Sequence, residues 1–196
     1  KQTTINSSIS LEGVGIHTGK DVKLTFNPAA PDTGYVFKRV DLEGKPIIEA
    51  LSKYVVNTQR GTTLEKSGVK LKTIEHVLAA LVGLEIDNVL IEINAEEPPI
   101  MDGSSKFFVD ALEKAGLKQL NSLRKEYVIK NVITHKDEKS GSEITVIPSE
   151  NYQITAMVDY DTKVLGTQNA SLSKLSEFKD NFSNARTFSF QHEIEM

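Results

Sequence analysis

The sequence predicts an α+β protein, in which strand-rich and helical stretches are largely segregated along the chain. Short runs of alternating polar and apolar residues, separated by turn-forming residues, fill the first third. Two amphipathic helices follow with one strand between them, and a second strand-rich part begins after about residue 122. With 196 residues, the chain has room for one large domain or two small ones.

The clearest strand of the first third is residues 21–26, where Val22, Leu24 and Phe26 alternate with polar neighbours. This period of two is typical of a half-buried strand. Asn27-Pro28 then predicts a turn, and residues 35–40 form a second strand candidate before another turn at 41–46.

Helical spacing of apolar residues predicts a first helix over residues 72–84 and a second after the turn at 102–105. The second helix is expected to start at a serine N-cap and to stop at Gly116, a residue favoured just past a helix end. Between the helices, residues 88–93 alternate in the manner of a strand.

Residues 118–126 lose periodicity and become polar, so we expect a domain boundary near Ser122 that separates residues 1–122 from 123–196. The second part is predicted to contain three strands, one hairpin loop and one helix, and to be incomplete as a domain. The strands are 127–133, 142–147 and 153–160, the loop is 137–142 and the helix is 170–182.

Composition excludes several classes of function. A net charge of −4 argues against a protein that binds the phosphate backbone of nucleic acids. The absence of cysteine excludes disulfides, thiolate catalysis and cysteine-ligated zinc. The longest apolar stretch, residues 77–82, is far shorter than the roughly 20 residues of a membrane-spanning helix.

The glycine-rich run 13–20 (Gly-Val-Gly-Ile-His-Thr-Gly-Lys) is suggestive of a phosphate-binding loop, but its spacing does not fit. Val14 stands where a P-loop needs glycine, and Asp21 follows Lys20 in place of serine or threonine. A dinucleotide-binding fingerprint fails as well, because the interval from Gly15 to Gly19 is one residue too long. We therefore expect a glycine-containing turn followed by a strand.

His76 lies on the face of the first predicted helix that is opposite to the apolar stripe, together with Ala79, Ala80 and Gly83. Small residues allow close approach of another segment, which indicates a cleft or an interface over His76. An ordinary exposed histidine is the alternative interpretation. At a cleft, Glu75 and His76 would suit metal-assisted hydrolysis, with the imidazole as metal ligand and the carboxylate as base.

The other histidines give weaker signals. His17 and Asp21 have a metal-ligand spacing, but the predicted turn and strand rule out a shared helix face. His135 and His192 have polar neighbours and are expected to be exposed. The loop 96–104 could bind a cation through its carboxylates, or could be a rigid connector whose Asp-Gly-Ser caps the second helix.

Five motifs in order make the sequence similar to a known family. They are Gly13-Val-Gly-Ile-His-Thr-Gly-Lys20, Thr73-Ile-Glu-His76, Ile86-Asp-Asn-Val89, Pro99-Ile-Met-Asp-Gly-Ser104 and Ala185-Arg-Thr-Phe188. Together they resemble the UDP-3-O-acyl-N-acetylglucosamine deacetylases, the zinc amidases of lipid A synthesis in Gram-negative bacteria. The resemblance extends over nearly the whole chain and implies a cytoplasmic enzyme that acts on a UDP-linked, acylated N-acetylglucosamine.

The resemblance also implies two similar α+β domains, each a small sheet layered against helices, with the site between them. It implies that His76 is a zinc ligand, that Glu75 is the general base and that His17 lies near the site. On a looser local similarity, Thr155 is expected to hold the carbonyl oxygen and Tyr152 to contact the uridine.

One departure from the family pattern concerns the metal. Members of the family carry a later His-x-x-x-Asp helix with two more zinc ligands, and this sequence contains no such segment after Ala185-Arg-Thr-Phe188. We therefore expect the chain to be the amino-terminal part of a deacetylase and to be inactive alone. A non-catalytic scaffold with the same fold is the alternative.

Overall fold

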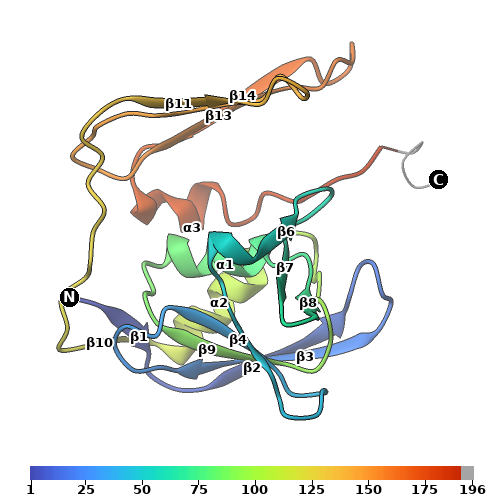
Figure 1. Cartoon of the computed structure of the whole chain (residues 1–196), viewed down its shortest axis with the longest axis vertical. Coiled ribbons are helices and arrows are strands. Elements are labelled where there is room, and N and C mark those ends of the chain that lie inside the picture. The colour runs from blue at the N-terminus through green and yellow to red at the C-terminus, as the bar shows by residue number, and fades with distance from the viewer. Residues whose placement is uncertain (191–196) are drawn as a thin grey trace. The chain divides into compact units, whose positions relative to one another are not determined.

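The computed structural model describes residues 1–190, which divide into two compact units. Unit 1 consists of residues 1–123 together with the segment that begins at Phe178, and unit 2 consists of residues 124–177. Figure 1 shows the strands and helices of both units, which together confirm the predicted α+β class. The described part of the chain contains no helix long and apolar enough to cross a membrane.

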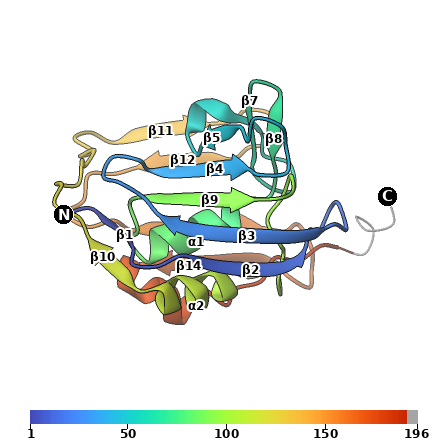
Figure 2. The ribbon, with the colours of Figure 1, turned by 90° about the horizontal axis from the view of Figure 1, so that it is seen from below.

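The centre of unit 1 is a five-stranded sheet with the order β2-β3-β9-β4-β5. All neighbours are antiparallel except β4 and β9, which are parallel, and Figure 2 shows the sheet from below. Its strands are β2 (Ile9–Val14), β3 (Asp21–Pro28), β4 (Tyr35–Arg39), β5 (Ile47–Glu49) and β9 (Val89–Ile93). The strands predicted at 21–26, 35–40 and 88–93 are therefore confirmed.

Helices α1 (Glu75–Gly83) and α2 (Lys106–Ala115) lie on one face of this sheet (Figure 1). The period-two strand residues Val22, Leu24 and Phe26 point into the core between the sheet and the helices. There the rings of Phe26 and Phe108 meet edge to face, with centroids 6.4 Å apart. The predicted helices are thus present, and the first begins at Glu75, three residues later than expected.

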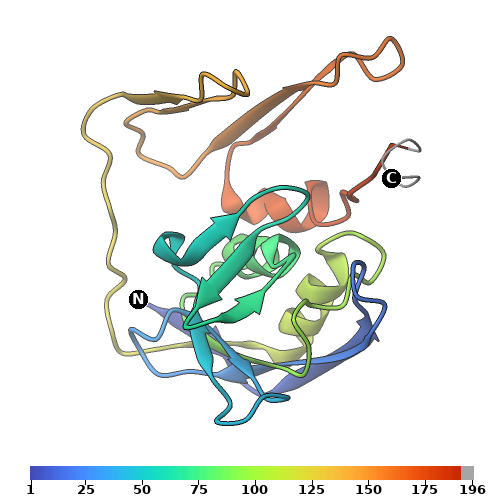
Figure 3. The same ribbon diagram turned by 45° about the vertical axis from the view of Figure 1, so that its right-hand side comes forward.

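Two small sheets complete unit 1. One contains β6 (Val55–Asn57), β7 (Thr63–Lys66) and β8 (Val69–Leu71), and the short helix η1 (Ser52–Tyr54) precedes it (Figure 3). The other pairs β1 (Thr3–Ile5) with β10 (Leu117–Gln119). The buried side-chain amide of Asn88 links the segments before β1 and before β4. It donates to Gln2 Oε1 at 2.9 Å and accepts from the Gly34 N–H at 3.0 Å.

Unit 2 consists of two antiparallel hairpins. The first pairs β11 (Ile133–Lys136) with β12 (Glu143–Val146), and the second pairs β13 (Ile154–Asp159) with β14 (Thr167–Leu172). Residues 137–142 form the loop of the first hairpin, as predicted, with Asp137 and Ser142 joined by a 2.8 Å backbone hydrogen bond. Nearly every residue of these strands is exposed.

The structure corrects two predictions for this part of the chain. Residues 127–132 form no strand, and β11 starts only at Ile133. The helix predicted over 170–182 is wrong for its first residues, because 170–172 belong to β14, where Ala170 pairs with Ala156. Only the end of that segment is helical, as η2 (Leu175–Glu177) and α3 (Phe178–Asn181).

Candidate functional site

A pocket of about 600 Å³ in unit 1 contains three of the residues singled out from the sequence. Glu75 and His76 come from the start of α1, and His17 comes from the turn between β2 and β3. The other lining residues come from the same turn between β2 and β3, the loop between β6 and β7, the connection from β8 to α1, the loop after β9 and the segment after α3. They are Ile16, Thr58, Arg60, Gly61, Thr62, Thr73, Ile100, Thr187, Phe188 and Ser189.

Glu75 and His76 are neighbours at the first turn of α1. The imidazole Nε2 of His76 lies 3.9 Å from Glu75 Oε1, which is too far for a hydrogen bond but close enough for electrostatic interaction. Both side chains are partly buried, with 17% of the His76 side chain and 37% of the Glu75 side chain exposed. An acid and an imidazole therefore face the same pocket and remain accessible to a ligand.

The loop 58–62 holds the Glu75 carboxylate in place. The Thr62 N–H donates to Glu75 Oε2 at 2.8 Å, and a β-carbon at Gly61 would lie only 3.2 Å from Glu75 Oε1. Oε2 accepts this hydrogen bond from the loop, and the other carboxylate oxygen, Oε1, is the one that lies toward His76. The geometry leaves one oxygen of Glu75 positioned to accept a proton in the pocket.

The glycine-rich run forms the turn that was predicted from its spacing. Gly13 and Val14 end β2, the turn is closed by a 3.0 Å hydrogen bond from the Gly15 N–H to the Lys20 carbonyl, and β3 starts at Asp21. Gly19 has a φ of +63°, a conformation that glycine adopts without strain. The exposed side chain of His17 therefore reaches the pocket from a turn and not from a helix.

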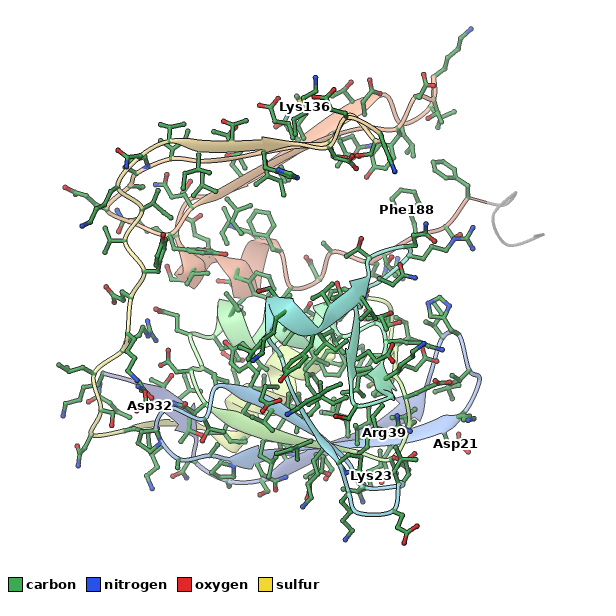
Figure 4. All side chains as sticks on the ribbon, in the orientation of Figure 1. Asp21, Lys23, Asp32, Arg39, Lys136 and Phe188 are labelled. Carbon is green, nitrogen blue, oxygen red and sulfur yellow. The ribbon has the colours of Figure 1, made fainter. Side chains whose placement is uncertain are left out.

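The segment from Phe178 to residue 190 supplies the last wall of the pocket. The Thr187 N–H donates to the Gly103 carbonyl at 2.8 Å, which fixes this segment to the turn before α2. Hydrogen bonding by Ser104, with a smaller contribution from the positive charge of Arg186, lowers the pKa of the Asp102 carboxyl. Phe188 is 56% exposed and labelled in Figure 4.

The face of α1 that carries Ala80 and Gly83 packs against another segment of the chain. This agrees with the interpretation of the sequence that placed a cleft or an interface there. Ala80 and Gly83 are buried, and the ring of Phe178 lies over Gly83. The expected apolar stripe is correspondingly imperfect, since Val82 is 36% exposed. Helix α1 is buried on two sides because the sheet covers one face and the later segment covers another.

Comparison with known proteins gives the family. A sequence model of the UDP-3-O-acyl N-acetylglycosamine deacetylases (LpxC) matches residues 2–196. This chain belongs to that family.

Several curated proteins are similar to this deacetylase-family chain. A bifunctional enzyme LpxC/FabZ of Bacteroides thetaiotaomicron is 45% identical over all of the chain and 42% of its own length. A UDP-3-O-acyl-N-acetylglucosamine deacetylase of Geotalea uraniireducens is 40% identical over 99% of the chain and 63% of its own length. A deacetylase of the same name from Saccharophagus degradans is 41% identical, with 65% of its length matched. The chain therefore spans between about two fifths and two thirds of these relatives.

A family-type zinc centre is not complete in the described residues of this deacetylase-family chain. A catalytic zinc ion needs three protein ligands. Within residues 1–190 no group of three potential ligands of the histidine, cysteine, aspartate and glutamate types lies close enough together. His76 and Glu75 fit the donor chemistry of such a centre in part. His17 lies in a turn and Asp21 is the first residue of β3, so these two residues share no helix face, as predicted.

The remaining predicted residues lie outside the pocket lining. Thr155 and Tyr152 belong to unit 2, where Thr155 on β13 shares a 2.9 Å hydrogen bond with Ser171 and Tyr152 is 55% exposed. The exposed side chain of His135 is confirmed, and His192 lies outside the described residues. In the loop 96–104, Ser104 Oγ accepts from the Lys106 N–H at 3.2 Å. A serine, Ser105, stands at the N-cap position of α2 as predicted, but its side chain makes no capping hydrogen bond.

Sequence reasoning did not identify Thr187 or the loop 58–62 as lining the pocket, nor Glu97 as the partner of the turn that carries His17. Ala185-Arg-Thr-Phe188 stands out in the sequence only as a motif of the family, and no spacing signal links it to α1. Glu97 is completely buried and bonded to the turn that carries His17. These contacts join residues that are far apart in the sequence, and local sequence patterns do not predict them.

Proposed function

We propose that the whole protein to which this chain belongs hydrolyses the N-acetyl amide of a UDP-linked, 3-O-acylated N-acetylglucosamine, in the cytoplasmic synthesis of lipid A. Family membership and the names of the similar deacetylases support this substrate class. The pocket of unit 1 is the proposed place of reaction.

The observation that carries the proposal is the fixed pair of Glu75 and His76. The Thr62 N–H holds Oε2 of Glu75, and Oε1 lies on the side of the His76 imidazole. In this arrangement Glu75 takes a proton from the attacking water at Oε1, and a general acid supplied by the rest of the whole protein protonates the departing amine. General base catalysis of this kind contributes about 10²- to 10⁴-fold to the rate.

We propose zinc as the cofactor, with His76 as one ligand. Zinc, when bound, supplies polarisation of the amide carbonyl and of a bound water. The structure offers one imidazole beside Glu75 and no complete ligand group in residues 1–190. The proposal therefore places the remaining ligands in residues of the whole protein that are not part of this chain, and expects the chain to be inactive alone.

Substrate contacts are assigned to further side chains. His17 lines the pocket and is proposed to contact the bound substrate. Thr187 supplies a hydroxyl at the pocket wall, and Thr155 is the hydroxyl expected from the resemblance, so these two are the candidates to hold the carbonyl oxygen. Tyr152 is the proposed contact of the uridine.

The test is Glu75→Gln in the longest product of the gene. Turnover of the acylated UDP-sugar should fall about 10²- to 10⁴-fold, while the metal content per chain stays unchanged. Glu65→Gln is a matched control, because Glu65 on β7 pairs with Lys70 at 3.5 Å and does not line the pocket. Full turnover by the Glu75 variant would remove that residue from its proposed role.

A non-catalytic scaffold is the second candidate, and the incomplete ligand group in residues 1–190 favours it. Zinc content per chain separates the two functions when it is measured on this 196-residue chain and on the longest gene product. Stoichiometric zinc in only the longer product supports the deacetylase. Zinc in neither product supports the scaffold.

A further inference from the structure

Glu97 is the one carboxylate among the described residues that is buried completely, with 0% of its surface exposed. It lies in the loop that follows β9 and does not line the pocket. Burial of a charged carboxylate costs free energy unless hydrogen bonds compensate it. Its partners therefore indicate why the residue is there.

The hydrogen bonds that Glu97 accepts within the described part of the chain come from the turn between β2 and β3. Oε1 accepts from the His17 N–H at 3.0 Å, from the Thr18 N–H at 2.7 Å and from the Thr18 hydroxyl at 2.7 Å. Two successive backbone N–H groups that point at one anion form a small anion-binding concavity. Oε2 is buried and has no partner among the described residues, so the turn alone compensates this carboxylate.

Gly15 shows how closely the carboxylate and the turn fit. A β-carbon at Gly15 would lie 2.3 Å from Glu97 Oε1 and 2.6 Å from Thr18 Oγ1. Such distances are not tolerated, and the carboxylate cannot withdraw without losing its three hydrogen bonds. A glycine is therefore required here by close approach and not by a positive φ.

The turn that Glu97 holds carries Ile16 and His17 to the pocket that also contains Glu75 and His76. We propose that Glu97 is a positioning residue that fixes the backbone at His17 and thereby presents the His17 side chain to the bound substrate. This inference rests on the proposed function, because it takes the pocket as the place where substrate binds. It adds a residue that touches no substrate and acts only through the turn.

The kinetic test is a double-mutant cycle in the longest gene product with Glu97→Gln and His17→Ala. Glu97→Gln keeps the shape of the side chain but removes the charge and places an amide donor in the buried site. In the native background it should lower kcat/KM about tenfold or more, mainly by raising KM, and in the His17→Ala background by less than about twofold. Equal losses in the two backgrounds would overturn the proposal, because a general loss of stability would act equally in both.

Two further variants keep the result interpretable. Thr18→Val removes one of the three hydrogen bonds and leaves the carboxylate charged, so it should give a smaller loss of the same kind. Glu96→Gln is the matched control, since this neighbouring carboxylate pairs with Lys72 at 3.3 Å, whereas the turn donates its hydrogen bonds to Glu97. Its kcat/KM should equal that of the unchanged protein.

Amide hydrogen exchange tests the same inference without any assay of activity. In Glu97→Gln the N–H groups of His17 and Thr18 should exchange about tenfold faster or more, while those of β3 keep their protection. Unchanged exchange at His17 and Thr18 would overturn the positioning role. If the proposed deacetylase function fails, so that Glu75→Gln has no effect on turnover, this measurement still decides whether Glu97 holds the turn.

Discussion

The ring of Phe178 lies so close over Gly83 of helix α1 that a β-carbon at Gly83 would fall 2.1 Å from ring atom Cδ1. Phe178 is the first residue of the segment that returns to unit 1 after the hairpins of unit 2. The same segment reaches the pocket at Thr187, whose N–H is bonded to the Gly103 carbonyl. The absence of a side chain at Gly83 therefore allows the pocket to gain its last wall.

Gly83→Ala should destabilise the whole protein by about 1–3 kcal/mol, because the added methyl group overpacks the contact with Phe178. The usual preference of helices for alanine over glycine acts in the opposite direction and is smaller, at about 1 kcal/mol. The measurement is the free energy of unfolding in urea. In a Phe178→Ala background the substitution should become neutral or stabilising, and a loss of the same size there would contradict the assigned contact.

Thr187→Val and Thr155→Val should have different effects on turnover in the longest gene product. Thr187 lines the pocket with Glu75 and His76, whereas Thr155 is bonded to Ser171 within a hairpin. Loss of a hydroxyl that holds the developing oxyanion costs about 10²- to 10³-fold in kcat. We expect this loss for Thr187→Val. A larger loss for Thr155→Val would show that Thr155, and not Thr187, holds the oxyanion.

Asp41 should make the stability of the protein dependent on pH in the acid range. Arg39, labelled in Figure 4, donates from Nε and from Nη2 to the two carboxylate oxygens of Asp41, at 2.9 and 2.7 Å. These hydrogen bonds lower the pKa of Asp41 below its ordinary value of 3.8. A carboxyl whose pKa is lower in the folded state than in the unfolded state stabilises the protein at pH values above its unfolded-state pKa. This stabilisation is lost as the pH falls through the folded-state pKa.

The corresponding test compares Asp41→Asn with the unchanged protein by unfolding at several pH values. The variant should be less stable at about pH 6, and the difference should shrink as the pH falls below about 4. A difference that stays constant down to about pH 2.5 would show that Arg39 does not hold the Asp41 carboxylate in solution.

Phe108→Ala should strongly destabilise the core of unit 1. The Phe108 side chain is fully buried and meets Phe26 edge to face, so its removal leaves a cavity between α2 and the sheet. The expected loss is about 3–5 kcal/mol in the free energy of unfolding, measured in urea. Phe107→Ala is the control, since this neighbouring ring is 43% exposed, and it should cost far less. Similar losses for the two variants would contradict the central position of Phe108 in the core.

The strands and helices of unit 1 could be predicted because their periodicity is a local property. Val22, Leu24 and Phe26 alternate on one strand, and the helix that carries His76 shows helical spacing. The prediction for 170–182 was wrong at its start because Ala170 and Leu172 favour a helix by intrinsic propensity, which tertiary context overrides. Cross-strand pairing with β13 decides in favour of the strand, and this partner is not visible in the segment itself.

The candidate site was predictable in part for the same reason. Glu75 and His76 stand side by side in one motif, and the turn that carries His17 has a clear glycine pattern. By contrast, Glu97 and Thr18 are 79 residues apart, and the contact of Thr187 with Gly103 joins two different loops. Such pairings depend on the completed packing of unit 1.

The position of β9 in the central sheet has a consequence for the order in which the chain can fold. Strands β2 and β3 form one local hairpin, β4 and β5 form another, and β9 pairs with β3 on one side and β4 on the other. During synthesis the two hairpins therefore emerge from the ribosome before the strand that joins them. Until Ile93 has emerged, each hairpin has an open edge that can pair with another chain, so a nascent chain of that length is the form most prone to aggregate.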